Sequence, residues 1–583
     1  MPYHSAGNAR DGDARDGDVA SSRPTTQANT GRWAITLGTL AVPGVLLLVA
    51  LGLRLFRLTG QSLWYDEGVS AYMTPRTFAE IATATAVDIH PPLYYWLLAA
   101  WAVPFGQGEV ALRSLSVLFG ALMVLATWGL ARALAGPAFG LAAGALLAIS
   151  PLAVQYSQEV RMYALAGLLA SASSWAVLAL VRAALDPATT RRRLTTLAVG
   201  YGLLVTGLLY THYYGTLVIL AQAVWVGLVA LRTRCWRMVP WYALAGGLAT
   251  LLFLPWLPVL LRQTSYYPGL GSPQPAWALL LDAANVLSIG LATTRFGFRA
   301  GLAPFLVLAA LGAGAVLGAG AAGAMNRAPT SPTSVTLPPV SSMLLPLSRL
   351  RERGRGGEGL LVLLWLLLPV AGIVVLSETR PLYEPRFLML VLPAWMILLG
   401  AGLVALGRLT AAILRGRSVL PAVARQLVIV AVAVVVAGLL LIPTARSLAS
   451  YYFDPVYARD DYRGLAQTVT LREQPGDAII LTAPGQVEIF SYYYRGGADL
   501  YPLPRQRPLD VIDTAARLDA IADAHGRVWF VRWAAHEADP ADVIAGWLER
   551  RSRRIGGSQF GRVELSLYDL NATAYAPDTA QSR

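Results

Sequence analysis

Hydrophobic residues form long runs along most of this chain, and most charged residues lie in the segments between the runs. About 20 apolar residues are needed to cross the hydrocarbon core of a bilayer, and runs near that length recur from residue 33 to residue 443. They lie near residues 33–53, 111–132, 138–157, 162–181, 194–211, 215–231, 239–261, 301–324, 360–376, 387–407 and 426–443. The pattern predicts an all-α polytopic membrane bundle of about 11 transmembrane helices over residues 33–443.

Three segments break this pattern. Residues 1–32 are polar and rich in Gly, Asp and Arg, so they cannot bury enough apolar surface to fold, and we expect a disordered cytoplasmic N-terminus. Residues 325–359 are rich first in Pro, Ser and Thr and then in Arg and Gly, which predicts a disordered cytoplasmic loop. From residue 444 to 583, strand-like runs such as RVWFVRW alternate with helical patterns such as VIDTAARLDAIADAHG, which predicts a small soluble α/β domain.

The composition agrees with a membrane protein. Of the 583 residues 55% are hydrophobic and 14% are charged, which is too apolar for a soluble globule. The net charge of +13 is spread over short loops, which favours topology signals over nucleic-acid binding. The sequence contains no lysine, so all 47 basic residues are arginines, and a lysine base or Schiff base is excluded. The single Cys235 excludes an internal disulfide.

Arginines concentrate in alternate loops, at residues 182–193, 232–237, 349–355 and 408–425. Because cytoplasmic loops carry the excess of positive charge, we expect a multi-pass plasma-membrane protein with a cytoplasmic N-terminus. The odd number of runs then places the C-terminal domain outside the cytoplasm. Arg54 and Arg57 oppose this orientation because they follow the first run, and the four later loops outweigh them.

The first outer loop, residues 57–96, holds two adjacent acids, Asp66 and Glu67, among aromatic residues. Carboxylates beside a bilayer are costly unless they are solvated, paired or used, so we interpret the loop as an active-site loop. The alternative is a helix start, where acidic side chains favour the positive end of the helix dipole. The loop closes with His90 before a Pro-Pro pair and with Tyr94 in an aromatic run typical of the headgroup layer.

Other polar residues fall at the outer ends of later runs. Glu159 and Arg161 lie in the second outer loop, where they either approach Asp66 or form a local surface pair of little energetic value. His212 lies among tyrosines, which is more typical of an aromatic belt than of a site. Arg386, at the head of a late run, is the best candidate to hold a phosphate.

Outer carboxylates and arginines on a membrane bundle suit a substrate that is both anionic and membrane-anchored, and a polyprenyl-phosphate sugar meets both conditions. Its transfer needs a base for the acceptor and a cation for the departing phosphate, and Asp66 and Arg386 match these needs. Two alternatives stay open: a transporter or flippase of a lipid-linked glycan, and a non-catalytic scaffold that binds an envelope partner.

Five segments, LWYDEGVSAY, DIHPPLYYWLLAAW, VALRSLSVLFG, SPLAVQYSQEVRMYAL and EPRFLMLVLPAW, resemble the GT-C glycosyltransferases of family 39. That family includes protein O-mannosyltransferases and aminoarabinose-lipid A transferases. The resemblance implies an inverting hexosyl- or pentosyltransferase that moves a sugar from a polyprenyl-phosphate donor to a lipid, glycan or protein of the envelope.

The resemblance also implies that Asp66 is the catalytic acid–base residue, with Glu67 beside it and Glu159 as the acid of the second loop. A divalent cation is left open, and Asp66 and Glu159 would hold it if one is used. The candidate residues for binding the donor phosphate and substrate are Tyr65, His90, Tyr94, Arg161, His212, Tyr383 and Arg386.

Overall fold

The computed structural model describes residues 27–266, 273–292, 301–325, 357–416, 421–506 and 509–572. Most of the two segments expected to be disordered, up to residue 26 and from 326 to 356, lies outside these residues. The chain divides into two compact units, Met1–Val45 and Leu46–Arg583. The described part of the first unit is the beginning of helix α1 (Gln27–Leu55), and every contact given below lies within the second unit.

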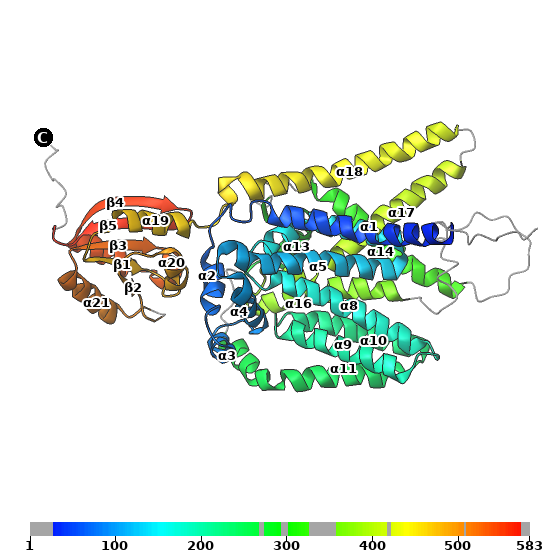
Figure 1. Ribbon diagram of the computed structural model, residues 1–583, viewed down its shortest axis with the longest axis horizontal. Helices are drawn as coiled ribbons and strands as arrows, with labels where there is room; N and C mark the ends of the chain where they lie inside the picture. The colour runs from blue at the N-terminus through cyan, green and yellow to red at the C-terminus, as the bar shows by residue number, and fades with distance from the viewer. Residues whose placement is uncertain are drawn as a thin grey trace, which may run out of the picture. The chain divides into compact units, whose positions relative to one another are not determined.

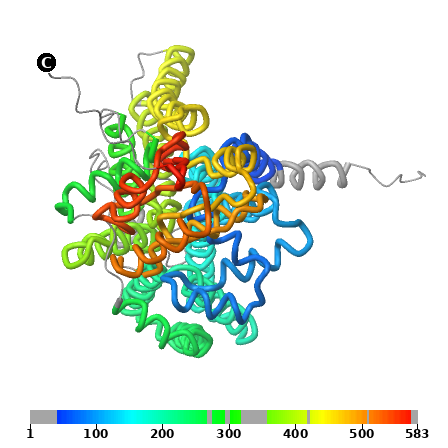
Figure 2. The backbone as a smooth tube through the Cα atoms, turned by 90° about the vertical axis from the view of Figure 1, so that its left-hand side faces the viewer, coloured from blue at the N-terminus to red at the C-terminus, as the bar shows by residue number. Residues whose placement is uncertain are grey.

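All of the regular secondary structure described up to residue 457 is helical (Figure 1). After α1 they are α2 (Tyr65–Met73), α3 (Phe78–Val87), α4 (Leu93–Phe105), α5 (Glu109–Ala135), α6 (Pro137–Ile149), α7 (Pro151–Ser157), α8 (Tyr163–Leu185), α9 (Arg191–Leu209), α10 (Gly215–Thr233), α11 (Met238–Phe253), η1 (Leu254–Trp256) and α12 (Leu257–Tyr266). They continue with α13 (Ala276–Ile289), α14 (Ala303–Met325), α16 (Glu358–Thr379), η6 (Pro385–Leu390), α17 (Leu392–Gly416), α18 (Ala422–Phe453) and η7 (Pro455–Tyr457). Many of them run in similar directions and are seen nearly end on in Figure 2.

Every predicted apolar run lies on helical structure, although fewer helices qualify as complete spans than the predicted eleven or so. Within the described residues, seven helices are long and apolar enough to cross a membrane, or eight if α6 and α7 form one bent span. The pair is bent by 58° at a break before Pro151, where Ser150 caps α7. The other three runs fall on α1 and α14, whose described apolar parts are short, and on α9, which begins with three arginines.

The segment 57–96, expected to be a loop, instead contains α2, α3 and the start of α4. Trp64 is extended, and α2 begins at the next residue with Asp66 and Glu67 in its first turn. The Trp64 amide donates to Glu67 Oε2 at 3.4 Å, so the two acids do lie at the positive end of a short helix. This confirms the helix-start alternative, which is compatible with a functional role for Asp66 because only Glu67 bonds the backbone of this helix end.

Arg54, which opposed the predicted orientation, is fully buried near the end of α1 rather than in a loop. Its guanidinium donates to the carbonyl of Ala148 at 3.0 Å and to Ser157 Oγ at 3.1 Å. Arg54 therefore caps the carbonyl end of α6 at the break before α7, where a cation favours the negative end of the helix dipole.

The C-terminal part of the chain is an α/β fold, as predicted, and α18 extends past the expected boundary at residue 444 to Phe453. Its five-stranded sheet has the order β2-β1-β3-β5-β4, with β1 parallel to β2 and β3, and β5 antiparallel to β3 and β4. The strands are β1 (Asp477–Leu481), β2 (Asp499–Pro502), β3 (Arg527–Arg532), β4 (Arg553–Phe560) and β5 (Val563–Asp569). The helices are α19 (Tyr462–Arg472), α20 (Gln486–Tyr493), α21 (Val511–Ala524), α22 (Ala535–Ala538) and α23 (Val543–Arg551).

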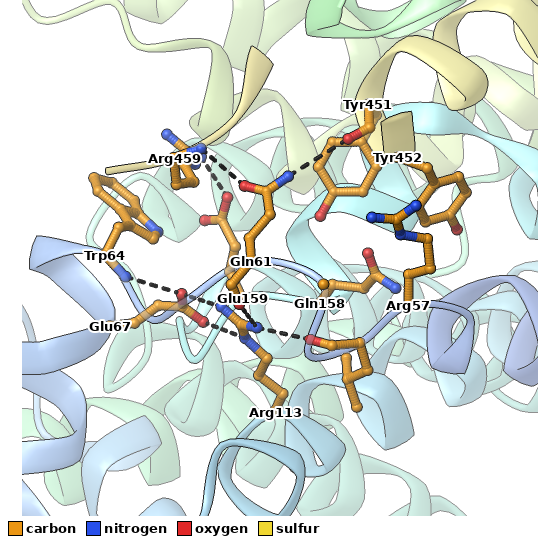
Figure 3. A pocket seen from close by; sticks show the side chains of 12 residues that line it. Arg57, Gln61, Trp64, Glu67, Arg113, Gln158, Glu159, Tyr451, Tyr452 and Arg459 are labelled. Atoms are coloured by element: carbon orange, nitrogen blue, oxygen red, sulfur yellow. Dashed lines mark hydrogen bonds and ion pairs between the residues drawn. The ribbon is translucent and has the colours of Figure 1, made fainter. Parts of the chain in front are cut away.

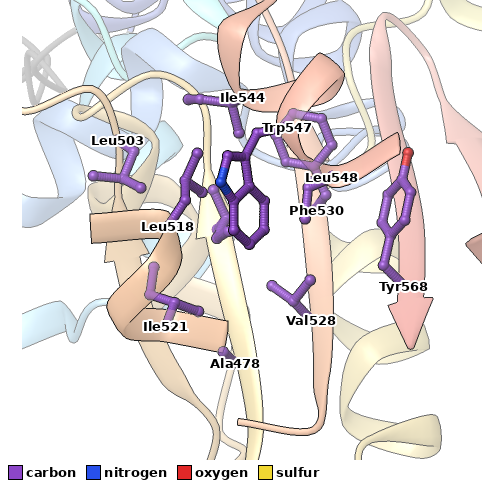
Figure 4. Packing of buried hydrophobic residues seen from close by; sticks show 11 residues of the cluster. Ala478, Leu503, Leu518, Ile521, Val528, Phe530, Ile544, Trp547, Leu548 and Tyr568 are labelled. Carbon is purple, nitrogen blue, oxygen red and sulfur yellow. The ribbon is translucent and has the colours of Figure 1, made fainter. Parts of the chain in front are cut away.

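Apolar side chains from helices α21 and α23 pack against the sheet (Figure 4). Trp547 of α23 and Leu518 of α21 lie over Val528 and Phe530 of β3 in one buried cluster. Strand β1 is buried at every position, as expected for a parallel strand covered on both faces. The domain therefore has its own hydrophobic core.

Candidate active site

Asp66, in the first turn of α2, lies between two arginines from distant parts of the chain. Arg386 of η6 donates from Nη1 to Asp66 Oδ2 at 2.9 Å. Arg161, which follows α7, lies 3.8 Å from the same oxygen and also donates to the Asp66 carbonyl at 3.3 Å. The Asp66 side chain is 19% exposed, so the carboxylate is partly shielded yet still accessible.

The arginines decide the protonation state of Asp66. Burial alone would raise the pKa of this carboxyl, but Arg161 and Arg386 outweigh burial and hold the pKa below its ordinary value. Asp66 is therefore a carboxylate at neutral pH. While both arginines neutralise it, it is a weak proton acceptor, because a base is most effective when its pKa lies near the working pH.

His90 lies next to Arg161 and orients it. His90 Nδ1 is 2.9 Å from Asp88 Oδ2, and His90 Nε2 is 3.2 Å from Arg161 Nη2. Because a guanidinium only donates hydrogen bonds, Nε2 must accept, which assigns the proton of a neutral ring to Nδ1 and directs it at Asp88. Burial and the charge of Arg161 lower the pKa of His90, in agreement with a neutral ring.

Glu67, expected to be catalytic, forms a buried ion pair with Arg113 of α5 (Figure 3). Arg113 donates to both carboxylate oxygens, at 2.9 and 2.6 Å, and the Val160 amide donates at 2.9 Å. Glu67 is fully buried with both oxygens bonded, so it fixes α2 against α5 and the second loop instead of facing a substrate. An arginine inside the apolar run 111–132 was the sequence signal for this partner, because such a charge needs a counter-ion.

Glu159 pairs with a residue from beyond the bundle. Its Oε1 accepts from Nη2 of Arg459, which precedes α19 (Figure 3). The Arg459 guanidinium lies 4.1 Å from the centre of the Trp64 ring. The backbone N–H of Arg459 donates to Gln61 Oε1 at 2.8 Å. Glu159 Oε2 is buried and has no partner among the described residues, and the cavity of about 30 Å³ beside it has room for about one water.

The remaining predicted residues are more dispersed. Tyr94 is fully buried and its hydroxyl bonds Ser116 at 2.9 Å, so it packs inside the bundle. The Tyr383 hydroxyl donates to Asp282 of α13 at 2.7 Å. His212 is buried with its ring 4.9 Å from the Phe387 ring, next to Arg386, which agrees with an aromatic role.

Asp66 and Glu159, the candidate ligands of a divalent cation, each pair with an arginine through one carboxylate oxygen. The described residues contain no cluster of three or more Asp, Glu, His or Cys side chains. Both carboxylates face guanidinium groups, which supply the positive charge that an ion would otherwise supply.

Comparisons with known proteins agree with this fold. Residues 89–258 match the family described as dolichyl-phosphate-mannose-protein mannosyltransferase. The structure of ArnT from Cupriavidus metallidurans bound to undecaprenyl phosphate is 16% identical, covers 92% of this chain and 98% of its own, and has a TM-score of 0.52. The structure of the archaeal oligosaccharyltransferase AglB from Archaeoglobus fulgidus, in complex with an inhibitory peptide and a dolichol-phosphate, is 12% identical and has a TM-score of 0.51. The match covers 91% of this chain and 74% of the AglB chain.

No curated protein matches the sequence. At these identities the structural likeness establishes architecture, and it agrees with the family match over residues 89–258 and with the motifs of the sequence. The chain is therefore a multi-pass membrane protein with the fold of the GT-C glycosyltransferases.

Proposed function

We propose that this protein is an inverting glycosyltransferase that moves a sugar from a polyprenyl-phosphate donor to an envelope acceptor on the extracytoplasmic face. The observation that carries the proposal is the accessible Asp66 carboxylate held between Arg161 and Arg386. Asp66, Arg161 and Arg386 supply one base and two cations at one place. Sugar transfer from a lipid phosphate requires a base for the acceptor and positive charge for the departing phosphate. The ArnT and AglB structures, which share the fold, contain undecaprenyl phosphate and a dolichol-phosphate.

The proposed reaction is a single displacement. Asp66 takes the proton of an acceptor hydroxyl or amine as that atom attacks the anomeric carbon of the donor sugar. The bond from the anomeric carbon to the phosphate oxygen breaks, and the electron pair leaves with the lipid phosphate. Arg386 and Arg161 stabilise the charge on the departing phosphate, and attack from the opposite face inverts the anomeric centre.

Donor binding also activates the base in this mechanism. A donor phosphate competes with Asp66 for the Arg386 guanidinium, which binds phosphate strongly. When Arg386 turns toward the phosphate, Asp66 loses one of the two arginine neighbours that lower its pKa. The pKa of Asp66 then rises toward the working pH, so the base becomes effective only when a donor is present.

The test is transfer of sugar by purified protein in liposomes that contain a polyprenyl-phosphate sugar and envelope extract. We expect Asp66→Asn to lose at least about a hundredfold in rate, since a positioned base contributes about 10² to 10⁴. The matched control is Glu80→Gln in the neighbouring helix α3, where glutamine still bonds the Thr77 amide of the capping box. Transfer by the Asp66→Asn variant at the wild-type rate would contradict the proposal, and a flippase or scaffold role would then take its place.

The sugar and acceptor follow from mass spectrometry of cells. Cells with Asp66→Asn are expected to accumulate one polyprenyl-phosphate sugar while one lipid, glycan or protein of the envelope lacks a sugar. Complete lipid-linked glycans that build up on the inner leaflet with unchanged structure would instead indicate transport.

A further inference from the structure

In the sheet of the C-terminal domain, the connections from β1 to β2 and from β2 to β3 lead to strands on opposite sides of β1. From the inner strand β1 the chain crosses to β2 on one side and then returns to β3 on the other side. In open parallel sheets the point where successive connections change sides leaves a crevice outside the carboxyl ends of the strands, and ligands usually bind there. Here the corresponding point lies beyond the carboxyl ends of β1 and β3, near Gly485 and Trp533.

A side chain from α2 contacts both of these residues. The Tyr65 ring stacks on Trp533, which directly follows β3, with 4.6 Å between the ring centres and 22° between their planes. A Cβ atom added to Gly485 would collide with the Tyr65 hydroxyl. A second glycine acts the same way, since a Cβ at Gly68 of α2 would collide with Ile489 of α20. Close approach of α2 and the α/β domain therefore depends on glycine at both positions.

Asp460 fixes the Trp533 ring. This carboxylate is 1% exposed, and its Oδ2 accepts from Trp533 Nε1 at 3.0 Å and from Arg562 Nη2 at 3.0 Å. The Asp460 carbonyl accepts from Ser62 Oγ at 3.0 Å, which ties the same residue to the segment before α2. The preceding residue, Arg459, pairs with Glu159 of the bundle. Arg459 and Asp460, which lie between η7 and α19, therefore connect the bundle to the α/β sheet.

We propose that Trp533 and Asp460 are positioning residues for Asp66, so that the α/β domain sets the geometry of the active site from outside the bundle. Tyr65 directly precedes Asp66 in the first turn of α2, and a displacement of its ring moves the carboxylate relative to Arg386. The position at which other sheets of this kind bind ligands is occupied here by Tyr65, a side chain of the helix that carries Asp66. This inference rests on the proposed function of Asp66.

The experiment compares Trp533→Ala with Trp533→Phe in the full-length protein. We expect Trp533→Ala to lower kcat by on the order of tenfold to a hundredfold, because a displacement of about 1 Å costs up to that much, while the KM for donor changes little. Trp533→Phe retains the stacked ring and is expected to recover most of the rate. Asp460→Asn, which keeps an acceptor for the Trp533 N–H, is expected to fall between the two.

Hydrogen exchange of the α2 amides supplies a readout that does not depend on activity. We expect faster exchange in Trp533→Ala than in the wild-type protein. The control is Arg551→Gln, which breaks an exposed ion pair with Asp519 in the same domain and is expected to leave α2 exchange and kcat unchanged.

Faster exchange of α2 together with a lower kcat supports the inference. Unchanged exchange overturns it at any level of activity, and faster exchange with an unchanged kcat overturns it as well. If the wild-type protein transfers no sugar, the proposed function fails, and the exchange data still decide whether Trp533 positions α2.

Discussion

Arg386 donates a 2.9 Å hydrogen bond to Asp66 across a sequence separation of 320 residues. The bond joins the first turn of α2 to the short helix η6 at the head of α17. It makes one guanidinium the partner of both the proposed base and the proposed leaving phosphate. In the proposed mechanism Arg386 exchanges Asp66 for the donor phosphate, and each of these two contacts can be tested separately.

Substitution of Arg386 is expected to impair transfer even when the positive charge is kept. Arg386→Gln loses a cation aimed at the departing phosphate, and we expect a loss in kcat of about 10² to 10³. Arg386→Lys keeps the charge but not the planar fork of donors, so a partial loss is expected. Steady-state rates with purified protein provide the measurement. Arg380→Gln in the same loop, where Arg380 bonds the Thr264 carbonyl, serves as the control, and equal rates for wild type and Arg386→Gln would refute the assignment.

The pH dependence of transfer is expected to report on His90. The pKa of His90 is lowered below the ordinary 6.5. The ring therefore stays neutral, and keeps accepting the hydrogen bond from Arg161, until the pH falls below this lowered pKa. Protonation at still lower pH turns Nε2 into a donor and repels Arg161, so the rate should fall on acidification with a midpoint below 6.5.

The variant His90→Gln tests whether His90 causes this fall of the rate at low pH, the acid limb of the pH profile. The glutamine oxygen still accepts from Arg161 but does not titrate, so the limb is expected to move to lower pH while the rate at neutral pH changes less. An acid limb that is identical in wild type and variant would show that another group titrates.

The Glu67–Arg113 pair is expected to contribute to stability rather than to chemistry. Glu67→Gln leaves a buried guanidinium without its counter-ion, and we expect it to destabilise the protein by about 3–5 kcal/mol. Arg113→Met combined with Glu67→Gln should cost less than the sum of the single changes, because both charges are gone. Thermal unfolding in detergent measures this coupling. Asp513→Asn, in an exposed pair with Arg517, is the control and should change stability little, and strictly additive costs would contradict a coupled pair.

Chelation is expected to leave transfer intact. Asp66 and Glu159 are each paired with an arginine, and the charge of that arginine disfavours a second cation at the same carboxylate while the pair persists. Transfer rates are compared before and after EDTA treatment of purified protein. A loss of activity that Mg²⁺ or Mn²⁺ restores would show that the arginines yield to a metal during the reaction.

The sequence by itself determined the helices of the bundle, the α/β nature of the C-terminal part and the family resemblance. Periodicity and apolar run length reflect interactions between residues that are near in sequence, so they can be read locally. The motif around Asp66 and the arginine ahead of α17 were visible for the same reason. The bend before Pro151 was less visible, because composition there continues to favour a single span.

Only the tertiary structure decided the partner of each charge. Asp66 and Glu67 are neighbours with similar local surroundings, yet one faces Arg386 and stays accessible while the other is buried against Arg113. The sequence also contained no signal that Arg459 reaches Glu159 from beyond the bundle. A buried charge is stable only with a counter-ion, and which counter-ion arrives depends on how distant segments pack, a relationship that no local pattern encodes.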